Sequence, residues 1–125
     1  MANATVTRST LRKISAWDMK EGGLALAGQN MVQGCMCGIG TAGTIRRGGG
    51  VIATFNGAML GRQLTKTLAS AAATDIIEWE TGIFCWANIG AITNASRGLL
   101  CYADDNQSVS LTNTNVIAGT IEFVD

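Results

Sequence analysis

The side chains that could carry chemistry fall in three short motifs. Asp104 and Asp105 are adjacent carboxylates, a pair whose oxygens suit divalent metal ions. Residues 38–43 (Gly-Ile-Gly-Thr-Ala-Gly) fit the GxGxxG pattern that holds dinucleotide phosphates. Cys35 and Cys37 form a CxC pair, and thiolates are metal ligands and nucleophiles. The chain has no histidine, which excludes Ser-His-Asp and Cys-His catalysis, imidazole metal ligands and the commonest proton shuttle.

Two of these motifs lack the surroundings that their chemistry needs. Residues 102–105 (Tyr-Ala-Asp-Asp) match the metal-binding tetrad of polymerases that copy RNA, but that site needs another carboxylate on an adjacent strand and a much longer domain. A dinucleotide site needs a helix directly after the glycines, and residues 44–50 (Thr-Ile-Arg-Arg-Gly-Gly-Gly) cannot form one of useful length. The sequence instead predicts a strand ending in an Asp-Asp-Asn turn and a glycine-rich hairpin connection.

The cysteines are predicted to be structural thiols. A zinc site would need two CxxC-like pairs or histidines, and a redox pair would need CxxC; the sequence has neither. Residues 1–15 are basic and lack a continuous apolar core, so we expect no signal peptide and synthesis in the reducing host cytoplasm. We therefore expect no metal, no cofactor, and buried or half-buried side chains at the four positions Cys35, Cys37, Cys85 and Cys101.

The composition indicates a subunit that is covered by neighbours. The 125 residues suit one domain with a sizeable core. Only 14% of residues are charged, against about 25% in an ordinary soluble domain, and nine basic and nine acidic side chains cancel. Hydrophobic residues reach 47%, which excludes intrinsic disorder, yet no apolar run is long enough for a membrane span. The charge balance disfavours a nucleic-acid binder, and the lack of histidine disfavours an enzyme.

Although the net charge is zero, most of the basic and most of the acidic residues lie in different halves of the chain. Residues 1–66 hold eight basic and two acidic side chains, whereas residues 67–125 hold one basic and seven acidic ones. Folding can interleave the two halves so that the charges neutralise one another locally. Alternatively, basic side chains reach an acidic surface on a neighbouring subunit. The candidate contacts for that role are Arg8, Arg12, Lys13, Arg46 and Arg47.

The pattern of short apolar stretches between Gly, Asn, Asp and Thr predicts an all-β chain, a small single-domain β-barrel or β-sandwich. Residues 1–16 lack apolar periodicity and are predicted to be an extended N-terminal arm, leaving 17–125 as the folded domain. Strands are expected at 30–37, 51–55, 75–88, 99–103, 108–112 and 116–124.

Two segments carry finer expectations. In residues 57–73 Leu60, Leu64 and Leu68 have helical spacing, but glycines and β-branched threonines favour a strand followed by a flexible loop. In residues 75–88 the apolar positions change from odd to even numbers at Gly82. This change predicts a strand with a glycine bulge that turns Phe84 inward.

The second half of the chain also resembles a known family. Residues 82–88 (Gly-Ile-Phe-Cys-Trp-Ala-Asn), 91–93 (Ala-Ile-Thr), 101–109 (Cys-Tyr-Ala-Asp-Asp-Asn-Gln-Ser-Val) and 118–125 (Ala-Gly-Thr-Ile-Glu-Phe-Val-Asp) resemble, in order and spacing, the tailed-phage head decoration (capsid cement) proteins. The first half is similar more loosely, through an apolar Ala-Gly stretch, a strand and a glycine-rich turn. These motifs are packing and turn signals, so the resemblance implies a fold and a role in the virion.

The resemblance implies a structural virion protein without enzymatic activity. Such proteins are small β-barrels or sandwiches that bind the outside of an icosahedral capsid where major capsid subunits meet, and they stabilise the shell. The expected partners are the major capsid protein and neighbouring copies of the chain, with no nucleic acid and no membrane. The alternatives are a tail or head-completion subunit of similar build, a small cytoplasmic nucleic-acid-binding barrel that uses the five basic side chains above, and an enzyme with carboxylate chemistry at Asp104 and Asp105.

Overall fold

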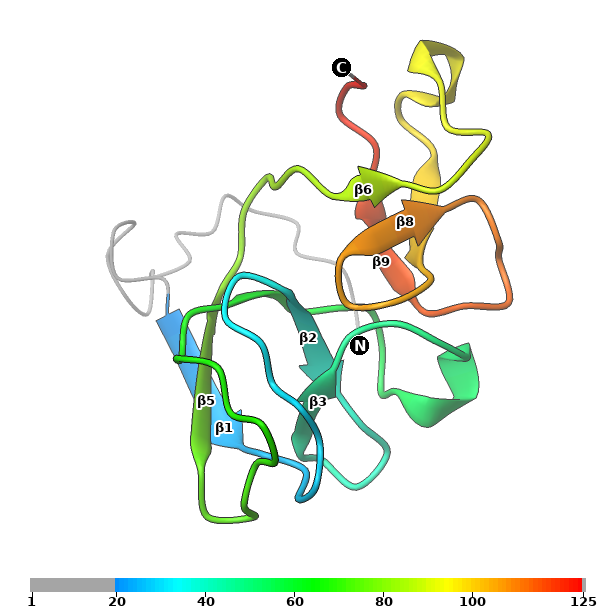
Figure 1. Ribbon diagram of the computed structural model, residues 1–125. Helices are drawn as coiled ribbons and strands as arrows, with labels where there is room; N and C mark the ends of the chain where they lie inside the picture. The colour runs from blue at the N-terminus through cyan, green and yellow to red at the C-terminus, as the bar shows by residue number, and fades with distance from the viewer. Residues whose placement is uncertain (1–19, 125) are drawn as a thin grey trace, which may run out of the picture.

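The computed structural model describes residues 20–124, so the arm predicted at 1–16 lies outside the described residues. The described chain forms two β-sheets and two single-turn 3-10 helices, at Ile52–Thr54 and Asn94–Ser96 (Figure 1). The prediction of an all-β chain is confirmed, and neither sheet closes into a barrel. Across residues 20–124 there is no helix that has both the length and the apolar character to cross a membrane.

The first sheet has five antiparallel strands in the order β1-β5-β4-β2-β3. Ile77 and Trp79 of β5 are buried, and Glu78 between them is exposed, as alternation along a half-buried strand requires. A single bridge between Ala25 and Ile45 brings the two edges of the sheet together without a ladder. The strands are β1 (Lys20–Leu24), β2 (Met36–Ile39), β3 (Ile45–Arg47), β4 (Gly61–Gln63) and β5 (Ile76–Glu80).

The second sheet has the order β6-β8-β7-β9, with β6 parallel to β8 and the other pairs antiparallel. Its strands are β6 (Ala87–Asn88), β7 (Leu100–Ala103), β8 (Ser108–Ser110) and β9 (Ile117–Thr120). The turn between β7 and β8 follows from local chemistry, because a carboxylate oxygen of Asp105 accepts a hydrogen bond from the Gln107 N–H at 2.9 Å. The predicted strand ending in an Asp-Asp-Asn turn is confirmed.

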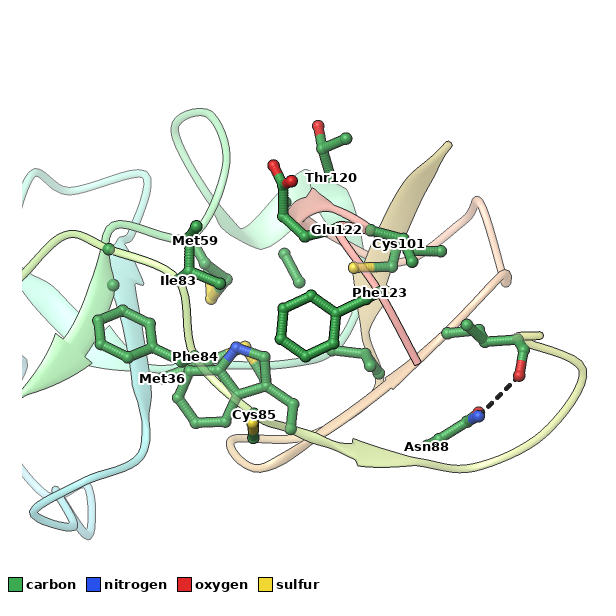
Figure 2. Close-up of a pocket in the computed structure, with 18 of the residues that line it drawn as sticks. Met36, Met59, Ile83, Phe84, Cys85, Asn88, Cys101, Thr120, Glu122 and Phe123 are labelled. Carbon is green, nitrogen blue, oxygen red and sulfur yellow. Dashed lines mark hydrogen bonds between the residues drawn. The ribbon is translucent and has the colours of Figure 1, made fainter. Parts of the chain in front are cut away.

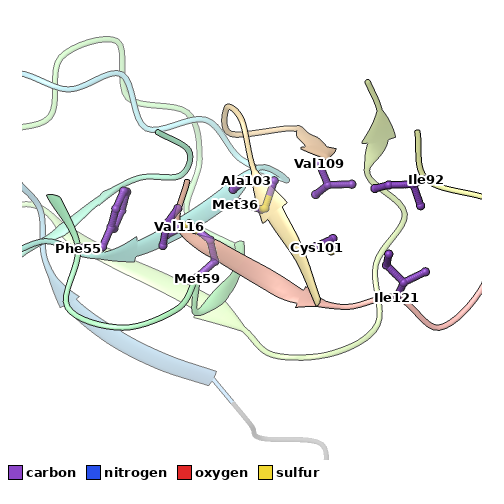
Figure 3. Packing of buried hydrophobic residues seen from close by; sticks show 9 residues of the cluster. All are labelled: Met36, Phe55, Met59, Ile92, Cys101, Ala103, Val109, Val116 and Ile121. Atoms are coloured by element: carbon purple, nitrogen blue, oxygen red, sulfur yellow. The ribbon is translucent and has the colours of Figure 1, made fainter. Parts of the chain in front are cut away.

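Two clusters of buried apolar side chains stabilise the sheets. The first cluster lies within the five-stranded sheet and its loops and includes Met31, Cys37 and Ile77. The second cluster joins the sheets, since Met36 of β2 and Met59 pack with side chains of the four-stranded sheet (Figure 3). Its buried members are Met36, Phe55, Met59, Ile92, Cys101, Ala103, Val109, Val116 and Ile121.

The strands predicted at 99–103 and 108–112 match β7 and β8. Those predicted at 30–37 and 116–124 overlap β2 and β9. The prediction of a strand at 51–55 is wrong. Residues 52–54 instead form a 3-10 turn whose exposed Ile52 leads to the buried Phe55. The sequence also gave no sign of β1, whose letters are Lys-Glu-Gly-Gly-Leu. Pairing with β5 makes this segment a strand, and a Cβ on Gly23 would lie 3.0 Å from the Ile45 side chain.

The two finer expectations are each partly confirmed. Residues 57–73 contain β4 and a bridge from Leu68 to Met31 rather than a helix, so the predicted strand is confirmed. Residues 75–88 do change their buried face, from Ile77 and Trp79 to the half-buried Phe84. The predicted bulge is wrong, because pairing stops at the end of β5, the chain bends and a strand resumes only at β6.

Candidate functional site

A groove of about 490 Å³ lies where the chain passes from the first sheet to the second (Figure 2). One wall is the crossing segment 81–86, and the other is β9 with the residues that follow it, 118–124. Met36 and Met59 from the cluster that joins the sheets also line it. A loop closes one end, where the Asn88 side-chain amide donates a hydrogen bond to the Ile92 carbonyl at 2.8 Å. We call this feature the junction groove.

The junction groove is lined mainly by large apolar side chains. The rings of Phe84 and Trp86 lie with their centroids 5.7 Å apart, tilted by 59°. Ile83 and Phe123 are 71% and 59% exposed, although side chains of their size gain free energy when they are buried. Figure 2 shows the Phe123 ring extending from its wall into the groove. Such a surface suits an apolar polypeptide segment.

One cation borders the groove. The Arg62 guanidinium lies 4.8 Å from the centroid of the Phe84 ring and pairs with the Glu80 carboxylate. The cation–π contact and the ion pair together fix the position of Phe84 at the start of the crossing segment. Both partners of the ion pair are partly exposed, so its contribution to stability is about 0–1 kcal/mol.

The crossing segment belongs to neither sheet in the described part of the chain. Within the described range of the chain, no backbone N–H or C=O of residues 82–86 hydrogen bonds with another backbone group. Pairing resumes at Ala87, whose N–H donates to the Gln107 carbonyl at 2.9 Å. Extended backbone with free donors and acceptors is what an added strand pairs with.

The structure separates the two candidate contact arginines that it describes. The Arg46 guanidinium is half-buried and lies 5.1 Å from the centroid of the Phe55 ring, with its Nε buried and unpaired among described atoms. Arg47 is exposed on the opposite face of β3, and its backbone N–H donates to the Gln29 side chain at 2.8 Å. Arg47 is therefore the member of the pair that a partner can reach. Arg8, Arg12 and Lys13 lie outside the described residues.

The two motifs that resembled catalytic or nucleotide sites form a hairpin and a side-chain hydrogen-bond network in this fold. Residues 38–43 belong to the β2–β3 hairpin, where the Gly40 N–H donates to the Thr44 carbonyl at 2.9 Å. Asp104 accepts hydrogen bonds from the Ser110 hydroxyl and the Asn115 amide, each at 2.7 Å. Among residues 20–124 no three His, Cys, Asp or Glu side chains gather as metal ligands would.

The cysteines differ in exposure more than the sequence suggested. All four are free thiols, but Cys85 is exposed on the crossing segment, which corrects the expectation that every cysteine is at least half-buried. Cys85 follows Phe84, and the half-buried Phe84 and Trp86 leave it on the open side of the chain. Burial raises the pKa of the Cys37 thiol to about 12. Desolvation also raises the pKa of Cys35 and Cys101.

We expect a maleimide at pH 8 to label Cys85 first and Cys37 last. Because the pKa of Cys37 is near 12, only about 10⁻⁴ of it is thiolate at that pH, and the thiolate is the reacting species. Mass spectrometry of native protein after brief labelling should therefore find one dominant adduct, at Cys85. Labelling in denaturant is the control and should modify all four thiols. An adduct at Cys37 that forms as fast as the one at Cys85 would contradict this burial pattern.

The sequence did not single out the junction groove as a site. Its only local signal was the change of apolar positions at Gly82, which marks the crossing segment but not the wall across from it. No protein-family model, curated protein or solved structure matches this chain.

Proposed function

We propose that this chain is a structural virion subunit of the tailed-phage decoration type. It binds the outer surface of an icosahedral capsid at junctions between major capsid subunits and stabilises the shell. Its two sheets serve as the layers of a small sandwich, and it carries no enzymatic activity. The partners are the major capsid protein and neighbouring copies of the chain. The resemblance of residues 82–125 to decoration proteins motivates this proposal.

The exposure of large apolar side chains is the structural observation that carries the proposal. An ordinary monomer covers most of such side chains, and clusters of them mark interaction surfaces. Here they occur in a chain with 14% charged residues and no net charge, a composition that favours association. The exposed large apolar side chains are Leu24, Val51, Ile52, Ile76, Ile83, Ile89, Leu99, Leu100, Leu111 and Phe123.

The charges support contact with neighbours as well. Among residues 21–124 one ion pair forms, between Arg62 of the basic half and Glu80 of the acidic half. Folding therefore neutralises little of the divided charge within the described chain. Exposed groups of both signs, such as Arg47 and Asp105, remain available to complementary surfaces, where they set the rate and register of docking.

A cryo-electron-microscopy map of the virion that contains this chain tests the proposal directly. We expect density for a two-sheet subunit on the outer shell at capsid-protein junctions. Density confined to the tail or the portal region would instead support a tail or head-completion subunit. Salt-sensitive retention of the isolated protein on DNA, together with its absence from the virion, would support the nucleic-acid-binding alternative.

Replacing Arg8, Arg12 and Lys13 together by Ser is expected to lower occupancy on stripped capsids about tenfold at low salt. Each exposed ion pair contributes about 0–1 kcal/mol, so three together reach roughly the 1.4 kcal/mol that corresponds to tenfold. The difference from the parent should shrink as salt shortens the screening length below about 10 Å. Occupancy is measured by sedimentation with capsids.

The matched control for the Ser variant keeps the charge. Arg8→Lys, Arg12→Lys and Lys13→Arg in one chain should bind like the parent, because a screened long-range attraction depends on charge more than on side-chain shape. A Ser variant that binds as well as the parent at low salt would place attachment in apolar and backbone contacts and contradict the charge role.

A further inference from the structure

The loop between the 3-10 turn at 52–54 and β4 contains an Asn-Gly pair. Of the asparagines in the sequence, only Asn56 precedes a glycine. Residues 56–58 form an exposed bend, and the residues on either side of it, Phe55 and Met59, are buried. The pair is therefore open to water while both of its flanks are held in the core.

An asparagine side chain can react with the backbone of the residue that follows it. The backbone nitrogen of Gly57 attacks the side-chain carbonyl carbon of Asn56, a five-membered imide closes, and the side-chain nitrogen leaves as ammonia after water carries the proton to it. Water then opens either imide carbonyl, which leaves a normal aspartyl or an isoaspartyl linkage. The net reaction consumes one water, releases one ammonia and needs no oxidant or cofactor.

Gly57 suits this reaction because it has no side chain beside the attacking nitrogen. Its φ of +84° lies in the left-handed region, and a Cβ built on it would have no contact within 4 Å among the described residues other than its chain neighbours. Asn113 is also exposed in a turn, but it precedes Thr114, whose β-branched side chain crowds the nitrogen. The fold therefore leaves room for the imide at Asn56.

The bend lies between two hydrogen bonds that belong to different sheets. The Asn56 N–H donates to the carbonyl of Ile39 in β2 at 2.8 Å, and the Met59 N–H donates to the carbonyl of Ile117 in β9 at 2.8 Å. Phe55 and Met59 both belong to the cluster that joins the sheets (Figure 3). A change in the length of this short loop therefore acts on the contact between the sheets.

We propose that Asn56 is a site of spontaneous deamidation through an imide with Gly57, and that the isoaspartyl product loosens the contact between the two sheets. An isoaspartyl linkage adds one carbon to the backbone between the two hydrogen bonds, whereas an aspartyl linkage adds only a negative charge. This inference concerns the covalent chemistry of the chain, so it stands or fails independently of the virion role proposed above.

Incubation of the full-length native protein in warm, mildly alkaline buffer, followed by peptide mapping, tests the modification. We expect conversion of the amide to the acid at Asn56 to be at least about tenfold faster than at Asn113, because glycine leaves the attacking nitrogen uncovered. An isoaspartyl methyltransferase should label the product at position 56. Asn56→Gln should abolish the labelling, because its longer side chain cannot close the five-membered ring.

Two outcomes would overturn the modification site. Equal rates at Asn56 and Asn113 in the native protein would show that the glycine gives no advantage. A faster rate at Asn56 that appears only in denaturant would show that the folded loop protects the pair.

The effect on the sheet contact has its own control. Asn56→Asp carries the same new charge on a normal backbone. In isoaspartyl protein separated by chromatography, the Met59 amide should exchange at least about tenfold faster than in Asn56→Asp, because its hydrogen bond opens locally. The Asp104 amide, which donates to the Ser108 carbonyl in the β7–β8 hairpin, should exchange equally in both. Equal exchange at Met59 would show that the loop absorbs the added carbon and would exclude the effect on the sheets.

Discussion

Alanine in place of Gly49 is expected to lower the free energy of unfolding by about 4 kcal/mol, the sum of a left-handed backbone penalty of about 1–2 kcal/mol and an overpacking penalty of about 1–3 kcal/mol. Gly49 has a φ of +95°, and a Cβ there would overlap the backbone of Asp105. The melting temperature should fall by roughly 15 °C. Thermal unfolding followed by circular dichroism measures the loss.

Gly49 has this sensitivity because its loop joins the two sheets. The neighbouring Gly50 donates its N–H to the Ala103 carbonyl at 3.0 Å and accepts from the Val116 N–H at 2.9 Å. Close by, the Met36 N–H donates to the Asn106 carbonyl at 2.8 Å. The loop after β3 therefore lies directly on the β7–β8 turn. Neither backbone can withdraw from a new Cβ without breaking these hydrogen bonds.

Gly50→Ala is the matched control for Gly49→Ala. Gly50 also has a positive φ, +100°, but a Cβ there would meet nothing within 4 Å. Its expected cost is therefore the backbone penalty alone, about 1–2 kcal/mol. The difference between the two variants isolates the overlap with Asp105. Equal losses would show that the two loops separate freely and would contradict their role as a joint between the sheets.

Local chemistry made part of the fold predictable from sequence. The β7–β8 hairpin combines apolar strands with an Asp-Asp-Asn turn, and every signal for it lies within a dozen residues. β1 was not predictable, because its lysine, glutamate and two glycines become a strand only through pairing with β5, more than fifty residues later. The 3-10 turn at 52–54 was missed because an apolar run alone does not tell a strand from a turn.

The candidate site was less predictable than the fold. The sequence marked the change of face at Gly82, so half of the junction groove had a signal. The opposite wall, including Phe123, comes near only through the packing of the two sheets, a long-range arrangement with no local mark. The candidate arginines show the same limit, since Arg46 and Arg47 are adjacent in sequence yet only Arg47 is exposed.

Ile77→Ala is expected to cost about 3–4 kcal/mol in the free energy of unfolding, within the range of large-to-small core substitutions. Ile77 is 0% exposed in β5 and packs in the cluster of the five-stranded sheet. Its neighbour Ile76 is 61% exposed on the other face of the same strand. Ile76→Ala removes the same atoms and should change stability by less than about 0.5 kcal/mol. Urea unfolding of both variants measures the contrast.

The same two variants distinguish a side chain that stabilises the fold from one that contacts a partner. The exposed isoleucine at position 76 is a candidate contact for a neighbouring subunit. If the chain binds a capsid as proposed, Ile76→Ala should unfold like the parent and yet occupy stripped capsids less well, by about the tenfold that 1–2 kcal/mol of lost apolar burial gives. Replacing the exposed Thr74 by Ala is a suitable control, because that change removes no large apolar side chain. Parental occupancy by Ile76→Ala would exclude this face of β5 from the interface and leave the junction-groove side of the molecule to make the contact.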